Sequence, residues 1–431
     1  MELKDKVEVT FHAGVLTIGG TIVEIAYKDS HIFFDFGTEF RPGLDLPDEN
    51  LQTLLDNGLI PELKGLYDLR FNYEYKGDET KDYAHTAVFI SHSHLDHTRM
   101  INYLDSDISM YALEATAEVV SVLNQNGDFL LPSPFESEKA FTRKITAVAP
   151  YGKIQVGDIE VQLVPVDHDA YGACGMIITV VGRKIAYTGD LRLHGYNPED
   201  TEKFTELAYK ADMMIMEGVS ISFPERKPVK VACPIHSENA LIAGFVQLQK
   251  VNPERQITFN AYPANVQRFS EMAKQSIRQI VLTADMALLL KKLFDQDVAY
   301  YKENVEQDTS LLDKTLEVDY VDLLADKTNY IWQVTDNFDK LQAGGLYIHS
   351  DAAPLGDFDP TYEKFLALLN SNAIEFVRMA CSGHATPDDL DKIVRLTKPQ
   401  LLIPIHSYHP EKLENPYGER ILPNRGQKLL L

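Results

Sequence analysis

The amino-acid sequence predicts an α/β fold in which one domain is interrupted by a second, inserted one. Short β-branched runs that end in Gly or Asp alternate with longer segments of helical pattern, which is typical of sheets covered by helices. From about residue 222 to 371 the pattern changes, and the last part of the chain returns to the first pattern. A chain of 431 residues is also too long for one compact core.

The first part of the chain contains predicted strands that lead to a histidine-rich segment. Val15–Ile25 predicts a strand, a glycine turn and a second strand, and Ile32–Gly37 predicts another strand that runs into a glycine. Residues 38–82 are polar, irregular and contain proline, so we expect an excursion at the edge of a cleft. Thr86–Ile90 predicts a buried strand that delivers the histidines.

The later elements follow from β-branched runs and from the helical spacing of apolar residues. We expect strands at Ile159–Val166, Lys184–Tyr187 and Leu401–His406, helices at Glu238–Lys250, Ala284–Phe294 and Lys392–Leu396, and charged irregular structure at Asp295–Asp326. The elements after residue 372 therefore complete the fold that the first part begins.

The composition is that of an acidic globular protein. The net charge of −23, from 64 acidic and 41 basic residues, argues against broad electrostatic binding of nucleic acid. It does not exclude a nuclease, because bound divalent cations invert the local field. No apolar run approaches the roughly 18–20 residues of a membrane helix, and Met1–Lys6 lacks an apolar signal core. Cys174, Cys233 and Cys381 are widely spaced, so we expect no disulfides and a cytoplasmic location.

Metal-competent side chains crowd the segment that follows the Thr86–Ile90 strand. His92 and His94 are two residues apart on extended chain, so both imidazoles point to one side. Asp96 and His97 follow where the chain should turn into a helix. Imidazole and carboxylate together suit zinc, or manganese where oxygen ligands weigh more. This spacing favours a metal site over a loop of solvated histidines.

One such segment cannot complete two metal sites, and further ligands are expected at other strand ends. His168 follows the strand at 159–166, and Asp190 follows the strand at 184–187 at a glycine turn. Taken alone, His168 is equally compatible with a surface histidine and Asp190 with an ordinary turn. Their order after the first segment favours both as metal ligands.

This pattern resembles the metallo-β-lactamase superfamily, its β-CASP subgroup and, within it, bacterial ribonuclease J. The resemblance rests on further motifs, namely Asp35, Met216–Gly218, Leu346–Ser350, Pro354–Gly356, Ser382–Ala385, Lys398–Pro399 and Ile403–His406. It implies an αββα sandwich interrupted by an inserted α/β β-CASP domain. The implied boundaries are 1–220 and 373–431 for the metallo-β-lactamase domain and 221–372 for the insertion.

The resemblance also implies a ligand set and an activity. One metal would be held by His92, His94 and His168, the second by Asp96, His97 and His406, with Asp190 bridging the two. Two divalent cations are implied, zinc first and manganese as the alternative. A hydroxide shared by metals about 3.5–4 Å apart would attack a phosphodiester.

Roles outside the metal ligands follow from the same resemblance. His384 would protonate the leaving oxygen, and Glu217 would orient that imidazole. Asp35 would not touch a metal but would fix a metal ligand or the loop that carries it. Taken alone, Glu217 is also compatible with a structural strand-end carboxylate and His384 with a helix cap. His409 is expected to be a bystander, and His12, His31, His85, His194 and His236 are expected to be structural.

The chain departs from ribonuclease J at two places. Ala380 stands where a histidine is usual, which leaves recognition of a 5′-monophosphate open, with Ser382 and Ser350 as candidate phosphate ligands. The chain ends about 25 residues past His406, without the extra carboxy-terminal domain that supports dimerisation in ribonuclease J. The oligomeric state therefore does not carry over from that family, and a homodimer is one of the open alternatives. Arg268 is compatible with a cleft-facing role and with a helix-surface position.

The sequence thus predicts a two-metal hydrolase that cleaves RNA, either from an end or internally. His406 favours RNA over single-stranded DNA, because the third motif of the subgroup tends to carry His in RNA-acting members and Val in DNA-acting ones. Two other classes stay open. A lactonase or thioesterase would keep the metals but would not need Glu217, His384 or the insertion. A catalytically inactive RNA-binding scaffold would be expected to lose ligands that are present here.

Overall fold

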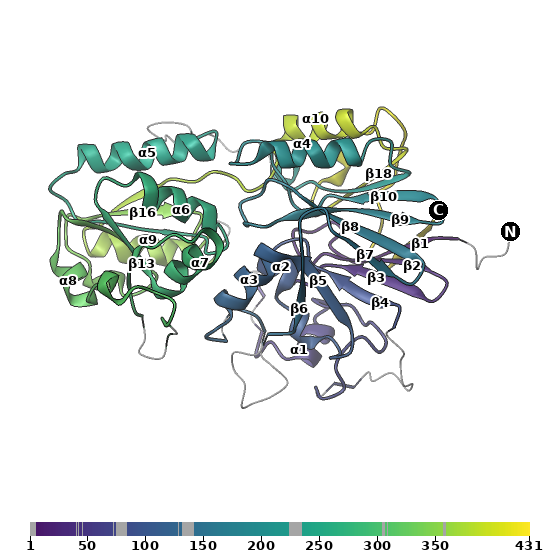
Figure 1. The fold of residues 1–431 in the computed structure, drawn as a ribbon, viewed down its shortest axis with the longest axis horizontal. Coiled ribbons are helices and arrows are strands. Elements are labelled where there is room, and N and C mark those ends of the chain that lie inside the picture. The colour runs from purple at the N-terminus through teal and green to yellow at the C-terminus, as the bar shows by residue number, and fades with distance from the viewer. Residues whose placement is uncertain are drawn as a thin grey trace. The chain divides into compact units, whose positions relative to one another are not determined.

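The computed structural model describes residues 6–39, 41, 43–44, 46–71, 73–74, 84–127, 129–131, 142–223, 235–303, 307, 309–356 and 359–431. The chain divides into two compact units (Figure 1). The first contains Met1–Leu193, Asn197–Arg226 and Gly383–Leu431, and the second contains His194–Tyr196 and Lys227–Ser382.

The first unit is built on a pair of sheets. Within its described residues, one seven-stranded sheet has the order β20 (Gln427–Leu430), β1 (Glu8–Ala13), β2 (Ile22–Tyr27), β3 (Ser30–Phe34), β4 (Thr86–Phe89), β5 (Ser109–Leu113) and β6 (Ile145–Val148). The other, also seven-stranded in the described residues, has the order β19 (Glu419–Arg420), β18 (Leu401–Ile405), β11 (Met213–Glu217), β10 (Arg183–Tyr187), β9 (Cys174–Val180), β8 (Ile159–Pro165) and β7 (Lys153–Val156).

Side chains of the two sheets form the central core of the first unit. Phe11 and Ile25 of one sheet and Val161 and Ile178 of the other belong to one buried cluster. Because strand side chains alternate between faces, the opposite faces need cover of their own. These faces are covered by the helices α1 (Leu51–Asp56), α2 (Leu95–Thr98), α3 (Glu114–Leu123), α4 (Pro198–Leu207) and α10 (Pro387–Thr397).

Each outer face forms a separate apolar cluster with its helices. Val88 of β4 packs in a cluster with Leu54 of α1 and Val120 of α3. Met214 of β11 packs with Phe204 of α4 and Ile393 of α10, and Figure 1 shows α4 and α10 side by side over their sheet. The layers therefore run helix, sheet, sheet, helix, and the predicted αββα sandwich is confirmed.

The predicted strands at 86–90, 159–166, 184–187 and 401–406 are confirmed within one residue at their ends, and the strand predicted at 32–37 lies slightly earlier, at Ser30–Phe34. The first strand was predicted wrongly. Residues 15–18 form bends, and the strand lies earlier, at Glu8–Ala13. Its position is set by pairing with β2 on one side and with the carboxy-terminal strand β20 on the other. Because β20 lies at the far end of the chain, its pairing with β1 cannot be predicted from the residues around β1.

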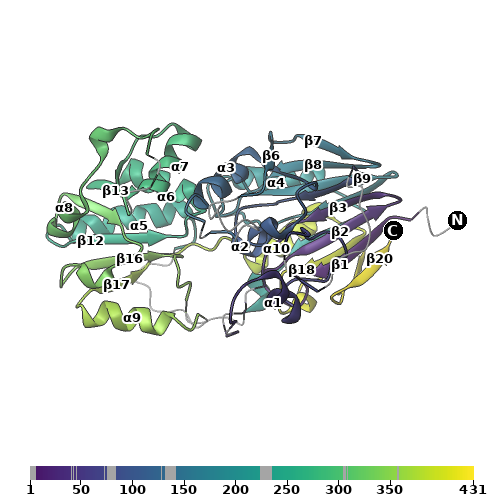
Figure 2. The same ribbon diagram turned by 90° about the horizontal axis from the view of Figure 1, so that it is seen from below.

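The second unit is a parallel sheet with helices on both faces. Its six strands in the described residues have the order β14 (Ala299–Tyr301), β13 (Gln279–Thr283), β15 (Tyr330–Gln333), β12 (Ile257–Ala261), β16 (Leu346–Ser350) and β17 (Glu375–Arg378). Its helices are α5 (Glu238–Val251), α6 (Val266–Gln275), α7 (Ala284–Phe294), α8 (Tyr320–Ala325) and α9 (Tyr362–Ser371) (Figure 2).

Aromatic side chains join the helices of the second unit to its sheet. Phe259 of β12 contacts Phe245 of α5 and Phe269 of α6. On the other face, Trp332 of β15 belongs to a buried cluster with Leu369 of α9. The predicted helices at 238–250 and 284–294 are confirmed. The expectation of irregular structure at 295–326 was wrong in part, because β14 and α8 lie within it.

Other expectations can be compared with the described residues. The helix predicted at 392–396 is confirmed as part of α10, and residues 38–82 include the short helix α1. Cys174 and Cys381 are buried thiols, and Cys233 lies outside the described residues. Among the helices of the described part, none has the length and apolar character that a membrane crossing requires.

Arg268 lies inside the second unit rather than on a helix surface or in a cleft. Its guanidinium is fully buried and pairs with the buried carboxylate of Glu238, at 2.7 Å. It also donates to Ser350 Oγ at 3.1 Å, to Asp351 Oδ2 at 3.0 Å and to the carbonyl of Cys381 at 3.1 Å. Arg268 therefore ties the end of β16 to the segment that carries Ser382.

We predict that Arg268→Met destabilises the protein by about 3–5 kcal/mol, because it leaves the carboxylate of Glu238 buried without its partner. Urea unfolding of the whole chain, followed by circular dichroism, measures this loss. The double variant Arg268→Met, Glu238→Leu should recover most of it, since neither charge is then buried alone. If Arg268→Met and wild type have equal free energies of unfolding, the prediction that this ion pair stabilises the protein is wrong.

Candidate metal centre

The candidate ligands follow strands of the first unit that end at one edge. β10, β11 and β18 are parallel neighbours, and β8 runs in the same direction because β9 is antiparallel to both β8 and β10. Their carboxyl ends carry His168 after β8, Asp190 after β10, Glu217 in β11 and His406 after β18. In the other sheet, β4 leads directly to His92. Residues far apart in the chain are thus delivered to one place.

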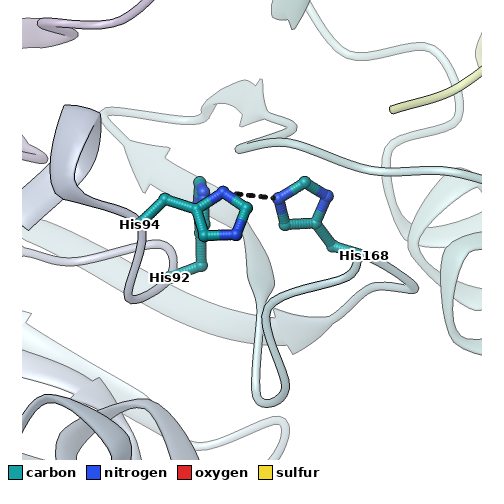
Figure 3. Close-up of side chains that lie close together, drawn as sticks. All are labelled: His92, His94 and His168. Carbon is teal, nitrogen blue, oxygen red and sulfur yellow. Dashed lines mark hydrogen bonds between the residues drawn. The ribbon is translucent and has the colours of Figure 1, made fainter. Parts of the chain in front are cut away.

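A first group of imidazoles consists of His92, His94 and His168. Each offers a ring nitrogen within 4.8 Å of those of the other two. His94 Nδ1 lies 3.3 Å from His168 Nε2, and Figure 3 shows these two rings turned toward each other with His92 beside them. Burial lowers the pKa of His92 and His168 well below the usual value. Both imidazoles are therefore neutral, which is the form that binds a metal.

A second group consists of Asp96, His97, Asp190 and His406, again with one donor atom each within 4.8 Å of the others. His97 Nε2 lies 3.2 Å from Asp190 Oδ2, and His406 Nε2 lies 3.5 Å from Asp96 Oδ2. Burial opposes a charge on His97, yet the carboxylates of Asp190, Asp96 and Asp35 raise its pKa well above the usual value. This place in the protein therefore attracts positive charge.

Asp190 lies between the two groups. Its Oδ2 atom is 3.7 Å from His92 Nε2 in the first group and 3.2 Å from His97 Nε2 in the second. Although burial acts in the opposite direction, the nearby histidines lower the pKa of Asp190 well below its usual value. Asp190 is thus an ionised carboxylate within reach of both groups.

Asp35 controls which nitrogen of the neighbouring histidines faces the site. Its buried carboxylate accepts hydrogen bonds from the Ser91 amide, at 2.7 Å, from Ser91 Oγ, at 2.9 Å, and from His97 Nδ1, at 2.9 Å. It also accepts one from the Tyr187 hydroxyl at 2.5 Å. Because Ser91 Oγ donates to Asp35, it accepts from His92 Nδ1 at 2.9 Å. In the neutral imidazoles of His92 and His97, Nε2 therefore carries the lone pair, and it faces the site.

The orientation of the donor atoms fits a pair of metal cations. Among the described residues, Nε2 of His92, His97 and His406 and Oδ2 of Asp190 are buried and make no hydrogen bond. Buried polar atoms without partners are costly, so their convergence indicates a ligand. His168 Nδ1 donates to the Gly383 carbonyl at 2.6 Å, which likewise leaves Nε2 for a metal. Imidazole with carboxylate suits zinc, with manganese as an alternative.

A histidine–carboxylate pair adjoins the two groups. His384 Nδ1 lies 3.4 Å from Glu217 Oε1 and 3.8 Å from Asp190 Oδ2. Burial disfavours the charged imidazole, but Glu217 and Asp190 raise the pKa of His384 to about 9. Glu217 is itself fixed, because its Oε2 atom accepts from the Val219 amide at 2.8 Å. His384 is therefore held as a proton donor, and Thr386, not His384, caps α10.

The structure brings the seven candidate metal ligands into the two groups and adds Asp35, Glu217 and His384 beside them. Ser350 and Ser382 belong to the second unit. Ser350 is buried and bonded to Arg268, and the Ser382 carbonyl accepts from His194. Their role as phosphate ligands stays a prediction. The remaining bystander, His409, pairs with Glu411 at 3.0 Å.

Several supporting residues escaped the sequence analysis. Ser91 adjoins the histidine motif, but its bond to Asp35 joins residues that lie 56 positions apart. Tyr187 precedes Asp190 by three residues and reads as an ordinary strand residue. Gly37 is required because an added Cβ would lie 1.9 Å from the carbonyl of Asp96. A glycine at a strand end was visible in the sequence, but the contact it permits was not.

We predict that Asp35→Asn weakens metal binding by about 10–100-fold, the usual range for residues behind metal ligands. In the asparagine variant an NH2 group replaces one carboxylate oxygen and faces groups that are themselves hydrogen-bond donors. Residue 35 then no longer fixes which ring nitrogen of His97 and His92 carries the proton. Competition of the apoprotein with a fluorescent zinc chelator measures the affinity. Tyr187→Phe is the matched control, since it removes a single donor and keeps the carboxylate. An unchanged affinity of Asp35→Asn would contradict this role.

Known proteins match the chain over different lengths. Residues 74–258 match the family model described as a beta-lactamase superfamily domain. Ribonuclease J of Mycoplasma genitalium is 21% identical over 443 residues, covering 94% of this chain and 68% of that protein. Ribonuclease J of Mycoplasma pneumoniae is 20% identical over 439 residues, with the same coverage of 94% and 68%. A crystal structure of a protein of unknown function from Enterococcus faecalis is 58% identical, with a TM-score of 0.94 over 99% of this chain and 100% of that one.

The superfamily match spans His92 to Asp190, the part of the chain that supplies six of the seven candidate ligands. The relatives extend the similarity to 94% of the chain. With the two groups of donor atoms, these similarities support a metal-dependent hydrolase. Residues 74–258 therefore carry a domain of the metallo-β-lactamase superfamily.

Proposed function

We propose that this protein is a two-metal phosphodiesterase that hydrolyses RNA, a β-CASP ribonuclease similar to ribonuclease J. The observation that carries the proposal is the pair His384 and Glu217 beside Asp190. A hydrolase of small, activated substrates does not need a proton donor at this position. A phosphodiester does, because its leaving oxygen is a poor leaving group until it is protonated.

We assign the seven candidate ligands to two cations, one for each group. His92, His94 and His168 would hold one cation, and Asp96, His97 and His406 the other, with Asp190 shared. When bound, two divalent cations supply a water of lowered pKa and neutralise charge on the phosphate oxygens. Zinc is the proposed metal, with manganese as the alternative.

The chain's own residues supply the proton transfer. The Glu217 carboxylate lies against His384 Nδ1 and keeps the imidazole charged and oriented. The side chain of His384 is partly exposed, at 21%. His384 would then protonate the leaving oxygen, and Glu217 acts through it as a positioning residue.

RNA is the proposed substrate because the relatives that match 94% of the chain are ribonucleases J. The second unit, a parallel sheet between helices, is proposed to be the β-CASP domain, with Ser350 and Ser382 as tentative phosphate ligands. The charge of −23 weighs against broad binding of nucleic acid and favours recognition near the cations. Single-stranded DNA is the second candidate.

We predict that the zinc- or manganese-loaded protein cleaves end-labelled RNA. His384→Ala should lower the rate by about 100–10,000-fold, the usual contribution of a general acid, while both metals stay bound. Asp96→Ala should lose a metal as well as activity. Product lengths on a denaturing gel separate trimming from an end from internal cutting.

His409→Ala is the matched control, since this exposed histidine lies three residues after His406 and pairs with Glu411. It should retain full activity. If the metal-loaded wild type cleaves neither RNA nor single-stranded DNA but turns over a lactone or thioester, the nuclease proposal is wrong. Metal binding without any turnover would favour a binding scaffold.

A further inference from the structure

An acidic residue outside the seven candidate ligands lies against the first group. Asp169 follows His168 directly, and its side chain is 10% exposed. Its Oδ1 atom is 3.3 Å from His168 Nε2 and 3.5 Å from His94 Nε2. The motifs found in the sequence give this residue no role.

The orientation of His168 makes the first of these distances informative. Its Nδ1 donates to the Gly383 carbonyl, so Nε2 is the nitrogen that faces a cation. Donor atoms that share one tetrahedral zinc at about 2.0–2.1 Å lie roughly 3.3–3.4 Å from one another. The spacing between Asp169 Oδ1 and His168 Nε2 matches that between His94 Nδ1 and His168 Nε2, also 3.3 Å.

Gly383 makes room for this carboxylate. A Cβ added there would lie 2.1 Å from Asp169 Oδ1 and 2.4 Å from its Cγ atom. The carbonyl of the same glycine holds His168. A larger residue at 383 would therefore displace Asp169, so the position of the carboxylate depends on this glycine.

We propose that Asp169 is an additional oxygen donor of the first metal position, beside His92, His94 and His168. This inference rests on the proposed metal centre but not on the nature of the substrate. A carboxylate added to three imidazoles supplies an oxygen ligand, and manganese prefers oxygen ligands more strongly than zinc does. The added carboxylate therefore strengthens the binding of manganese more than the binding of zinc. Asp169 thereby gives the first position a greater tolerance for manganese than three histidines alone would have.

The test uses the whole chain, stripped by a chelator and titrated separately with Zn²⁺ and Mn²⁺ in a calorimeter, with metal content measured after dialysis. Wild type should bind two ions per chain. Asp169→Asn keeps the shape and removes the charge, and it should weaken one of the two binding steps by about 10–100-fold. The loss should be larger for Mn²⁺ than for Zn²⁺. Gly383→Ala should cause the same shift in selectivity.

Asp167→Asn is the matched control. Asp167 is buried two residues earlier, and its carboxylate lies 3.4 Å from Arg192 Nε. It should lower the melting temperature without changing the ratio of the Zn²⁺ and Mn²⁺ affinities. An equal loss of metal in Asp167→Asn would overturn the proposal, because local unfolding would then explain both.

The outcomes separate this inference from the proposed function. If wild type binds two ions and Asp169→Asn binds both metals with unchanged affinity, the inference is overturned and the metal centre stands. If wild type binds neither metal, both fail. A selective loss of one Mn²⁺ step in a normally folded Asp169→Asn supports the inference.

Discussion

The candidate site depends on one buried carboxylate, that of Asp35. It accepts hydrogen bonds from Ser91 after β4 and from Tyr187 at the end of β10, so it joins the two sheets of the first unit. It also sets the protonated nitrogen of His97 directly and that of His92 through Ser91. Its own backbone has a φ of 58°, which is costly for a non-glycine residue and is retained where the surroundings demand it.

Electrostatics follow from this arrangement. The first unit places the partly exposed Asp96 and the buried Asp169 and Asp190 among closely packed histidines. Burial favours neutral imidazoles at His92 and His168, whereas carboxylates favour a cation around His97. Divalent cations satisfy both demands, because they bind the neutral nitrogens and balance the acidic groups. The acidity of the whole chain is thus compatible with an active site for a polyanion.

The second unit is stabilised by a different set of interactions. Its sheet is held between helices by apolar contacts, and it contains the buried ion pair of Arg268 with Glu238. Arg268 links Glu238 at the start of α5 to Ser350 and Cys381, which are far apart in the chain. Breaking a buried ion pair is costly, so the conformation of these segments is strongly determined. Both tentative phosphate ligands adjoin them.

The sequence by itself determined the features that depend on local pattern. Alternating and helical periodicity located β4, β8, β10, β18, α5 and α7, and the spacing of His92, His94, Asp96 and His97 indicated a metal site before any fold was known. The ends of predicted strands added His168 and Asp190, and resemblance to a family added Glu217, His384 and His406. The structure brings these residues together as groups of donor atoms.

Tertiary structure decided what depends on contacts between distant residues. The pairing of β1 with β20, the bond from Tyr187 to Asp35 and the bond from His168 to Gly383 join positions 152 to more than 400 residues apart. The burial of Arg268 and the place of Asp169 beside His94 are of the same kind. A local sequence pattern does not indicate such partners, because these contacts form between residues that are close in space but distant in the chain.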